Sequence, residues 1–126
     1  MLIGDLARLS GLSKDGIRHY EEMGIVYSVP REAGSRIYRE YDPANLDRIE
    51  KARQAQKLGL TLKEIGPLLD VHESREVTEA ETITFLEERL AVVQGRIAEL
   101  RRMERFIEAK LSRHRALVES SIASSG

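Results

Sequence analysis

The side chains that could do chemistry in this sequence are mostly basic and aromatic, and their chemistry is the binding of phosphates and bases. They gather in two short segments. The segment 13–20 contains Ser13, Lys14, Arg18, His19 and Tyr20. The segment 36–39 contains Arg36, Tyr38 and Arg39. Because guanidinium groups hold phosphate oxygens in a bidentate manner, we expect both segments to contact nucleic acid.

A plainer interpretation is open for each of these residues, since most Arg and Lys side chains are solvated surface charges. The four tyrosines, however, all lie near basic residues, at positions 20, 27, 38 and 41. Further basic residues follow on a predicted helix, at Arg48, Lys51 and Arg53. This clustering favours a binding surface over scattered charge.

Composition limits the other functions that the chain could have. Its 126 residues include 20 Lys and Arg, 21 Asp and Glu and no cysteine, which gives a formal net charge of −1. Disulfides, thiolate metal sites, iron–sulfur clusters and cysteine nucleophiles are thereby excluded. We find no nucleophile–base set, phosphate-binding loop or metal cluster, and we expect no enzyme, cofactor or metal site. Basic residues must gather on one face if the chain binds nucleic acid.

The first 24 residues have the spacing of a helix-turn-helix. Apolar residues at 2, 6 and 9 share one helical face, and Gly11 ends that helix. Ser13 is a good N-cap for a second helix to about Met23, with Gly24 after it. A helix N-terminus favours phosphate, and the second helix of this motif enters the major groove.

Two β-rich runs come next, at 25–29 and 36–39, with a polar loop at 31–35 between them. Runs of this kind predict a hairpin with an exposed tip. A hairpin directly after a helix-turn-helix indicates a winged-helix arrangement, in which the hairpin grips the backbone or minor groove beside the helix.

Two more helices complete the N-terminal part. Asp42 and Pro43 suit the start of a third helix, which ends near residue 58. Thr61 and Glu64 form a capping box for a short fourth helix. Pro67 lies inside that helix, where the loss of a backbone hydrogen bond should distort the last turn.

Residues 79–118 carry an apolar heptad repeat that starts at Ile83. Nine of its eleven a and d positions are aliphatic, and Glu104 and His114 are the exceptions. Sustained heptads indicate a coiled coil, whose narrow seam requires another copy of the chain. The residues expected at the dimer interface are Ile83, Leu86, Leu90, Val93, Ile97, Leu100, Ile107 and Leu111. A long helix packed within its own chain is the alternative, and the charges beside the seam do not decide between parallel and antiparallel pairing.

We therefore expect a mainly α fold with four parts: a winged helix-turn-helix DNA-binding domain at 1–70, a joint at 71–78, a dimerisation helix at 79–118 and a flexible tail at 119–126. Thr78 with Glu81 should cap the long helix. The N-terminus has no secretory signal pattern and no apolar run is long enough to span a membrane, so we expect a cytoplasmic protein.

Three motifs occur in order along the chain, at 17–25 (IRHYEEMGI), 38–42 (YREYD) and 58–65 (LGLTLKEI). Together they resemble the motifs of one family, the MerR-family transcription regulators. Residues 17–25 (IRHYEEMGI) are similar to its I-R-Y-Y-E-x-x-G-L signature. Residues 38–42 (YREYD) resemble its Y-R-x-Y element, and residues 58–65 (LGLTLKEI) resemble its L-G-F-S-L-x-E-I element. The three occur in the family's order and spacing, and the long helix lies where the family has an antiparallel dimerisation coiled coil.

The resemblance implies a homodimer that binds a palindromic promoter element and bends and untwists the DNA for RNA polymerase. By position, it places the residues of the 13–20 segment on the recognition helix and Tyr38 and Arg39 on the wing, with Arg18 and Arg39 as the firmest DNA contacts. Tyr41 could instead be a packing residue. A chromosome-organising protein without promoter remodelling is the alternative, and a coiled-coil module that does not bind DNA is a third hypothesis.

The sequence departs from the family pattern at several positions. His19 replaces an aromatic residue, Gly66 and Pro67 replace helix formers, and Glu79 stands where metal-sensing members have a cysteine. We therefore exclude soft-metal and thiol-based sensing and expect no large effector domain. A borderline metal at His72, Glu79 and His114, a small molecule, a protein effector or no effector all stay open.

Overall fold

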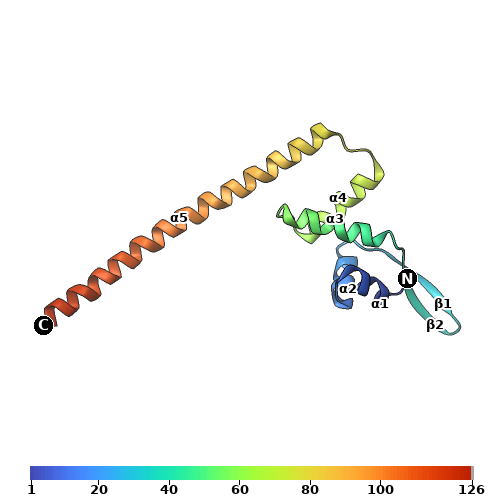
Figure 1. Cartoon of the computed structure of the whole chain (residues 1–126), viewed down its shortest axis with the longest axis horizontal. Coiled ribbons are helices and arrows are strands. Elements are labelled where there is room, and N and C mark those ends of the chain that lie inside the picture. The colour runs from blue at the N-terminus through green and yellow to red at the C-terminus, as the bar shows by residue number, and fades with distance from the viewer. Residues whose placement is uncertain (126) are drawn as a thin grey trace. The chain divides into compact units, whose positions relative to one another are not determined.

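The computed structural model describes residues 1–125 and contains two compact units, the head, Met1–Glu81, and a second unit from Thr82 onwards. Helices dominate, and a single hairpin is present among the described residues (Figure 1). The elements are α1 (Ile3–Ser10), α2 (Lys14–Glu22), β1 (Ser28–Ala33), β2 (Arg36–Tyr41), α3 (Asn45–Lys57), α4 (Leu62–Ser74) and α5 (Glu79–Ser125).

Helices α1 and α2 form the predicted helix-turn-helix. Gly11 ends α1 with a φ of 77°, a left-handed conformation that glycine adopts without steric cost. The Ser13 hydroxyl then accepts a hydrogen bond from the Gly16 amide at 2.9 Å and caps α2. Leu6 and Ile17 are fully buried, so the apolar faces of the two helices meet in the core.

Strands β1 and β2 form an antiparallel hairpin, which we call the wing. The first strand lies later than predicted: it begins at Ser28, so residues 25–27 precede it, and it continues to Ala33, into the predicted loop. Pairing from Arg31↔Tyr38 to Ala33↔Arg36 leaves only Gly34 and Ser35 at the turn. Gly34 has a φ of 65°, which suits so tight a turn. The Arg31 Nε lies 2.8 Å from Glu40 Oε2, and this ion pair supports the extended part of the hairpin.

The core of the head lies between the helix-turn-helix and the helices α3 and α4. Its largest fully buried side chains are Leu6, Ile17, Ile25, Val26, Ile49 and Ile65. Helix α3 begins at Asn45, two positions after Pro43, and Asp42 accepts a hydrogen bond from the Ala44 amide at 2.8 Å. The third helix is present as predicted, but its start is two residues later than expected: Ala44 and not Asp42 is the N-cap.

Helix α4 is longer than the sequence indicated. The Thr61 hydroxyl caps it by accepting from the Glu64 amide at 3.3 Å, as the capping box predicted. The helix then continues through Pro67 to Ser74, into the segment predicted as a joint. Pro67 lies inside the helix, at its sixth residue, and is exposed; it removes one backbone donor but does not end the helix.

Helix α5 is a single uninterrupted helix of 47 residues (Figure 1). Its start carries the predicted cap: the Glu81 amide donates to Thr78 Oγ1 at 3.2 Å, and the Thr78 amide donates to Glu81 Oε1 at 3.3 Å. The helix runs to Ser125, through most of the segment predicted as a flexible tail, because no Gly or Pro follows Gly95 until position 126. Gly126 lies outside the described residues. No helix within residues 1–125 is long and apolar enough to cross a membrane.

Candidate nucleic-acid interface

Helix α2 presents its basic residues on the face opposite the core. Lys14, Arg18 and His19 are exposed, and Ile17 on the other face is fully buried. Arg18 Nη1 lies 2.8 Å from Asp15 Oδ1, one turn earlier on the helix. An exposed pair of this kind is weak, so Arg18 can exchange the carboxylate for a phosphate. Helix α2 is here called the recognition helix, and its exposed face carries hydrogen-bond donors suited to DNA.

Tyr20 does not belong to this exposed face. Its ring is 7% exposed, and its hydroxyl donates to Gln56 Oε1 of α3 at 3.4 Å. The position is three residues after Ile17, so the helical period turns Tyr20 toward the core. Tyr20 is therefore a packing residue of the core, and too little of its side chain is accessible for the predicted DNA contact.

The wing separates the three residues predicted to contact DNA. Successive side chains on a strand point to opposite faces, so Arg36 and Tyr38 share one face of β2 and Arg39 lies on the other. Arg39 is turned toward the recognition helix: its Nε donates to Ser28 Oγ at 2.9 Å, and its Nη2 lies 3.6 Å from Glu21 Oε2. Arg39 therefore helps to hold the wing on α2, while Arg36 and Tyr38 face away from that contact.

Glu21 is a functional residue that the sequence reasoning missed. Its carboxylate, at the end of the recognition helix, accepts hydrogen bonds from Tyr41 and Ser28 at the base of the wing. Tyr41 is 2% exposed, which confirms a packing position for this ring. Burial and the hydrogen bond to Glu21 raise the pKa of Tyr41 above its ordinary value. Only the presence of Glu21 in the 17–25 motif could have drawn attention to it.

The three basic residues of α3 that the sequence analysis singled out have structural partners. Lys51 Nζ lies 2.9 Å from Asp47 Oδ2, and Arg53 donates to the Ser10 carbonyl at the end of α1. Arg48 is 5% exposed and contacts the residues that follow α2. Arg48 therefore cannot reach DNA, contrary to its expected place among the surface cations.

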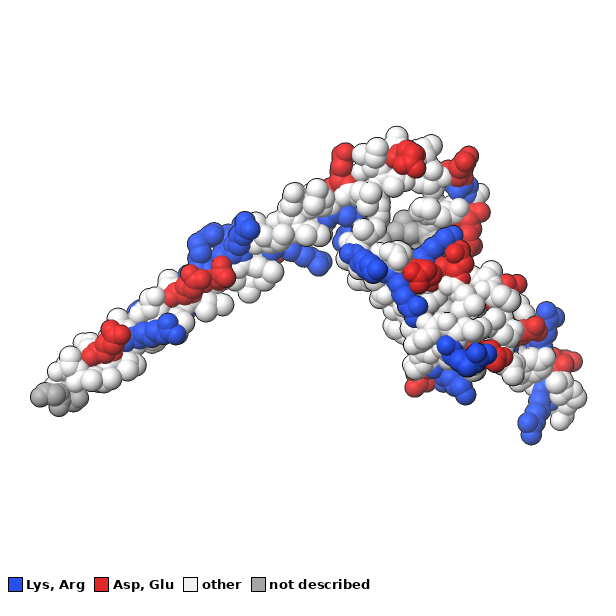
Figure 2. All heavy atoms as spheres, in the orientation of Figure 1, with Lys and Arg blue, Asp and Glu red and all other residues white. Residues whose placement is uncertain are grey.

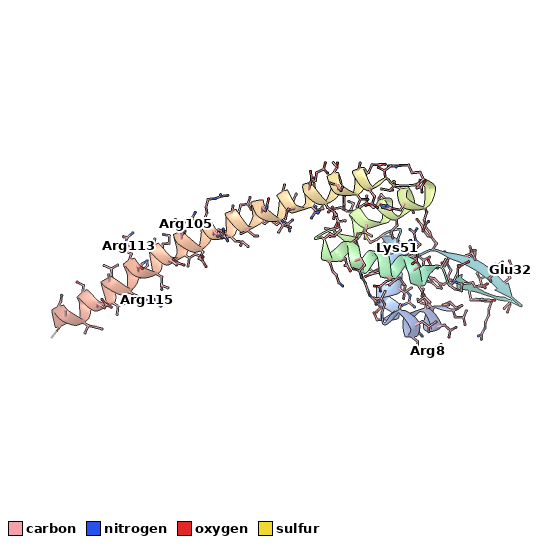
Figure 3. The ribbon with its side chains drawn as sticks, turned by 45° about the horizontal axis from the view of Figure 1, so that its top comes forward. Arg8, Glu32, Lys51, Arg105, Arg113 and Arg115 are labelled. Atoms are coloured by element: carbon pink, nitrogen blue, oxygen red, sulfur yellow. The ribbon has the colours of Figure 1, made fainter. Side chains whose placement is uncertain are left out.

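Charge on the visible face of the head is mixed. Figure 2 shows Lys and Arg side chains beside Asp and Glu on the helices and on the wing. Figure 3 places Arg8 on α1, Lys51 on α3 and Glu32 on the wing. The visible face of the head is therefore not uniformly basic, and any contact with DNA on it would depend on individual Lys and Arg side chains.

The long helix carries the predicted seam as an unpartnered apolar stripe. All eight seam residues are exposed in the single chain, from 41% at Val93 to 62% at Leu100. Charged residues lie on other sides of the helix, with Arg105 and Arg113 projecting on one side of α5 and Arg115 on the other (Figure 3). An apolar stripe of this length marks an interaction site.

Comparison with known proteins decides the family. The MerR HTH regulatory protein family matches residues 1–71, and the family described as "MerR, DNA binding" matches residues 46–110. The chain belongs to the MerR family of helix-turn-helix transcriptional regulators. The resemblance in the three sequence motifs, the winged helical fold and the function of DNA-binding regulator are thereby confirmed.

Several MerR-family relatives cover most of this chain. The transcriptional regulator ZntR of Escherichia coli K12 is 36% identical over 108 residues, covering 84% of this chain and 74% of the relative. The mercuric resistance operon regulatory protein of Bacillus cereus is 35% identical over 106 residues, covering 83% and 78%.

Two solved structures share the fold. The first is a transcription regulator from Ralstonia metallidurans in complex with lead(II), with a TM-score of 0.71, 29% identity and coverage of 85% of this chain and 82% of that one. The second is HiNmlR, a MerR-family regulator bound to promoter DNA, which has a TM-score of 0.52, 23% identity and coverage of 88% and 86%.

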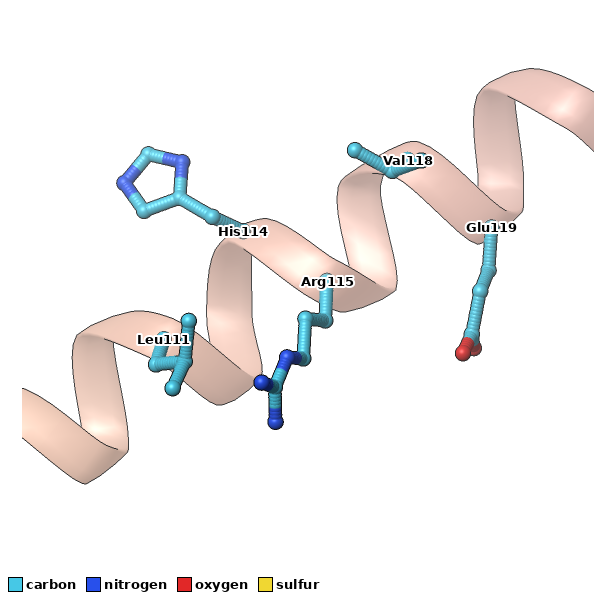
Figure 4. Close-up of a pocket in the computed structure, with 5 residues that line it drawn as sticks. All are labelled: Leu111, His114, Arg115, Val118 and Glu119. Carbon is cyan, nitrogen blue, oxygen red and sulfur yellow. The ribbon is translucent and has the colours of Figure 1, made fainter.

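Within the MerR family this chain lacks the ligands of a thiolate metal site, since it has no cysteine. No group of three or more His, Asp or Glu side chains that could hold a metal occurs within the described part of the chain. A shallow hollow on α5 is lined by Leu111, His114, Arg115, Val118 and Glu119. Figure 4 shows His114 pointing away from the side to which Arg115 and Glu119 project, so these residues do not converge on a ligand.

Proposed function

We propose that this MerR-family regulator binds a palindromic promoter element as a homodimer. The recognition helix α2 enters the major groove, and the wing contacts the adjacent backbone or minor groove. The observation that carries the proposal is the exposed face of α2. Its capped N-terminus, Lys14, Arg18 and His19 lie together on the side away from the core.

The apolar stripe of α5 supports the dimeric form. A second copy of the same stripe would cover the eight exposed seam residues and remove them from water. A two-fold symmetric dimer presents two equal recognition helices, which matches the symmetry of a palindrome. We extend the family's antiparallel pairing of the long helices to this chain.

The proposed DNA contacts are Ser13, Lys14, Arg18 and His19 on the recognition helix and Arg36, Tyr38 and Arg39 on the wing. Arg39 would use the exposed part of a side chain that also holds Ser28 and Glu21. The regulator would act without catalysis, in the cytoplasm beside the chromosome and RNA polymerase. It would control transcription by bending and untwisting the promoter, so part of its specificity comes from the energy of DNA deformation.

Site selection from random duplexes with the purified full-length protein, at two salt concentrations, tests the proposal. Recovery of one palindrome, with affinity that falls as salt rises, supports a promoter-binding dimer. Binding without sequence preference would favour the chromosome-organising alternative. Absence of binding at both salt concentrations would overturn the assignment of α2 as a DNA-binding helix.

A further inference from the structure

A buried arginine holds the backbone that directly follows the recognition helix. Arg48 lies on α3, and its side chain is 6% exposed. Its Nε donates to the Ile25 carbonyl at 2.6 Å, and its Nη2 donates to the Gly24 carbonyl at 3.0 Å. The guanidinium thus fixes the two residues at which the chain leaves α2.

The same guanidinium also holds α4. Its Nη2 donates to Asp70 Oδ1 at 3.1 Å, and its Nη1 donates to Glu73 Oε1. The centroid of the Tyr27 ring lies 4.8 Å from the guanidinium carbon of Arg48, and the Tyr27 hydroxyl donates to Asp70 Oδ1 at 3.1 Å. We call Arg48, Asp70 and Glu73 the Arg48 clamp, since they join the end of α2 to the second half of α4.

Close backbone packing reinforces this junction. Gly66 of α4 lies against the carbonyl of Met23, and a Cβ at position 66 would collide with that oxygen. Asn45 adds two bonds from α3: its Oδ1 accepts from the Tyr27 amide at 3.0 Å, and its Nδ2 donates to the Tyr27 carbonyl at 2.8 Å. Residues 23–27 are therefore held from both α3 and α4.

We propose that the Arg48 clamp is a positioning device that sets which half-site spacing the dimer accepts. Helix α4 is the last element of the head before residues 75–78 and the dimerisation helix α5, so it is the covalent route between each recognition helix and the dimer. Fixing α2 to α4 fixes the recognition helices with respect to that route. This inference rests on the proposed function, because it requires a dimer on a two-fold site.

DNA geometry makes the consequence measurable. One base pair added between half-sites moves the second half-site by ~3.4 Å and rotates it by about 35°. A rigid head can follow this change only by deforming the DNA, whereas a head whose α2 can shift against α4 absorbs part of it. With the clamp intact, a change in half-site spacing should therefore lower the affinity of the dimer for DNA.

The test measures the affinity of the full-length dimer for a series of duplexes that contain the selected palindrome with one or two base pairs added or removed at its centre. The variant Asp70→Ala with Glu73→Ala removes both α4 acceptors but leaves Arg48 and its carbonyl bonds in place. Both carboxylates are 55% exposed, and alanine favours the helix, so α4 is retained. Glu73→Ala alone is the milder second variant.

We expect the wild-type dimer to lose at least about tenfold in affinity for each base pair added to or removed from the centre of the palindrome. The variant with both Asp70→Ala and Glu73→Ala should lose less than about threefold for each base pair. A variant that is only partly folded lowers every affinity by the same factor, so the ratio between spacings isolates positioning from stability. An unchanged ratio in both variants, or a wild-type protein that binds all spacings equally, would overturn the proposal.

The matched control is Asp47→Asn with Glu76→Gln, which also removes two negative charges from the head, outside the clamp. Its spacing ratio should equal that of wild type. A flattened ratio in this control would assign the effect to net charge and overturn the role of the clamp. Failure of wild type to bind any selected duplex would instead overturn the proposed function, and this inference with it.

Discussion

The Tyr41 hydroxyl donates a 2.8 Å hydrogen bond to Glu21 Oε1, which joins the end of the wing to the end of the recognition helix. The second oxygen of the same carboxylate accepts from Ser28 and lies 3.6 Å from Arg39 Nη2. One side chain of α2 thus holds both strands of the wing. A DNA-binding surface made from two elements depends on such a connection, since each element alone is small.

Glu21→Ala should loosen the wing and weaken DNA binding. The change leaves the buried Tyr41 hydroxyl without its acceptor, which costs about 1–3 kcal/mol of unfolding free energy. Urea unfolding measures this cost, and the affinity for the selected palindrome should fall at the same time. Glu22→Ala is the matched control, because the neighbouring carboxylate of Glu22 is 73% exposed and pairs with His19 Nδ1 at 3.8 Å, not with the wing. Equal stability of the two variants would contradict the role assigned to Glu21.

The elements of this fold were predictable wherever local chemistry determines them. Ser13, Thr61 and Thr78 each cap a helix with the hydroxyl bond that their sequence context predicts. The sequence predicts too early an end for α4, because Pro67 removes one backbone donor inside the helix but does not stop it. The sequence also predicts too early an end for α5, because a serine-rich segment indicates a frayed end, although this one contains no helix-breaking residue before position 126.

The site was less predictable than the elements. Residue type alone suggested that Tyr20 and Arg48 were surface groups, whereas both are buried. The position of Tyr20 three residues after Ile17 could have indicated its burial. The partners of Arg48 are 22 to 25 residues away in sequence, so only tertiary packing places them around the guanidinium.

Arg18→Ala should weaken binding to the selected palindrome and leave the dimer intact. Loss of one phosphate contact from each protomer should reduce the slope of log affinity against log salt by ~2. Fluorescence anisotropy at several salt concentrations measures both the affinity and the slope. Arg102→Ala on α5 is the matched control, since position 102 lies on the side of the helix away from the seam. An unchanged slope in Arg18→Ala would remove Arg18 from the interface.

Leu90→Asp or Ile97→Asp should separate the dimer into monomers. Each change places a charge in the apolar seam, where it would be desolvated without a partner. Analytical ultracentrifugation measures the oligomeric state, and affinity for the palindrome should fall because each monomer contacts one half-site. Ala109→Asp, on the outer side of α5, is the control and should stay dimeric. A dimer that survives both seam changes would show that these positions do not form the interface.

The cap of α5 should show in the titration of Glu81. Hydrogen bonds from Arg75 and from the Thr78 amide lower the pKa of Glu81 from 4.5 to about 2. A carboxylate whose pKa is depressed in the folded state contributes stability above its ordinary pKa of 4.5, and that contribution is lost as the pH falls from 4.5 toward 2. Carbon-detected NMR titration of the Glu81 carboxyl measures this pKa directly. Arg75→Gln should raise the Glu81 pKa toward 4.5, and Arg96→Gln, farther along α5, should leave it unchanged. A Glu81 pKa that is the same with and without Arg75 would mean that the ion pair, with Nη2 at 2.7 Å from Oε2, does not hold the start of the dimerisation helix in solution.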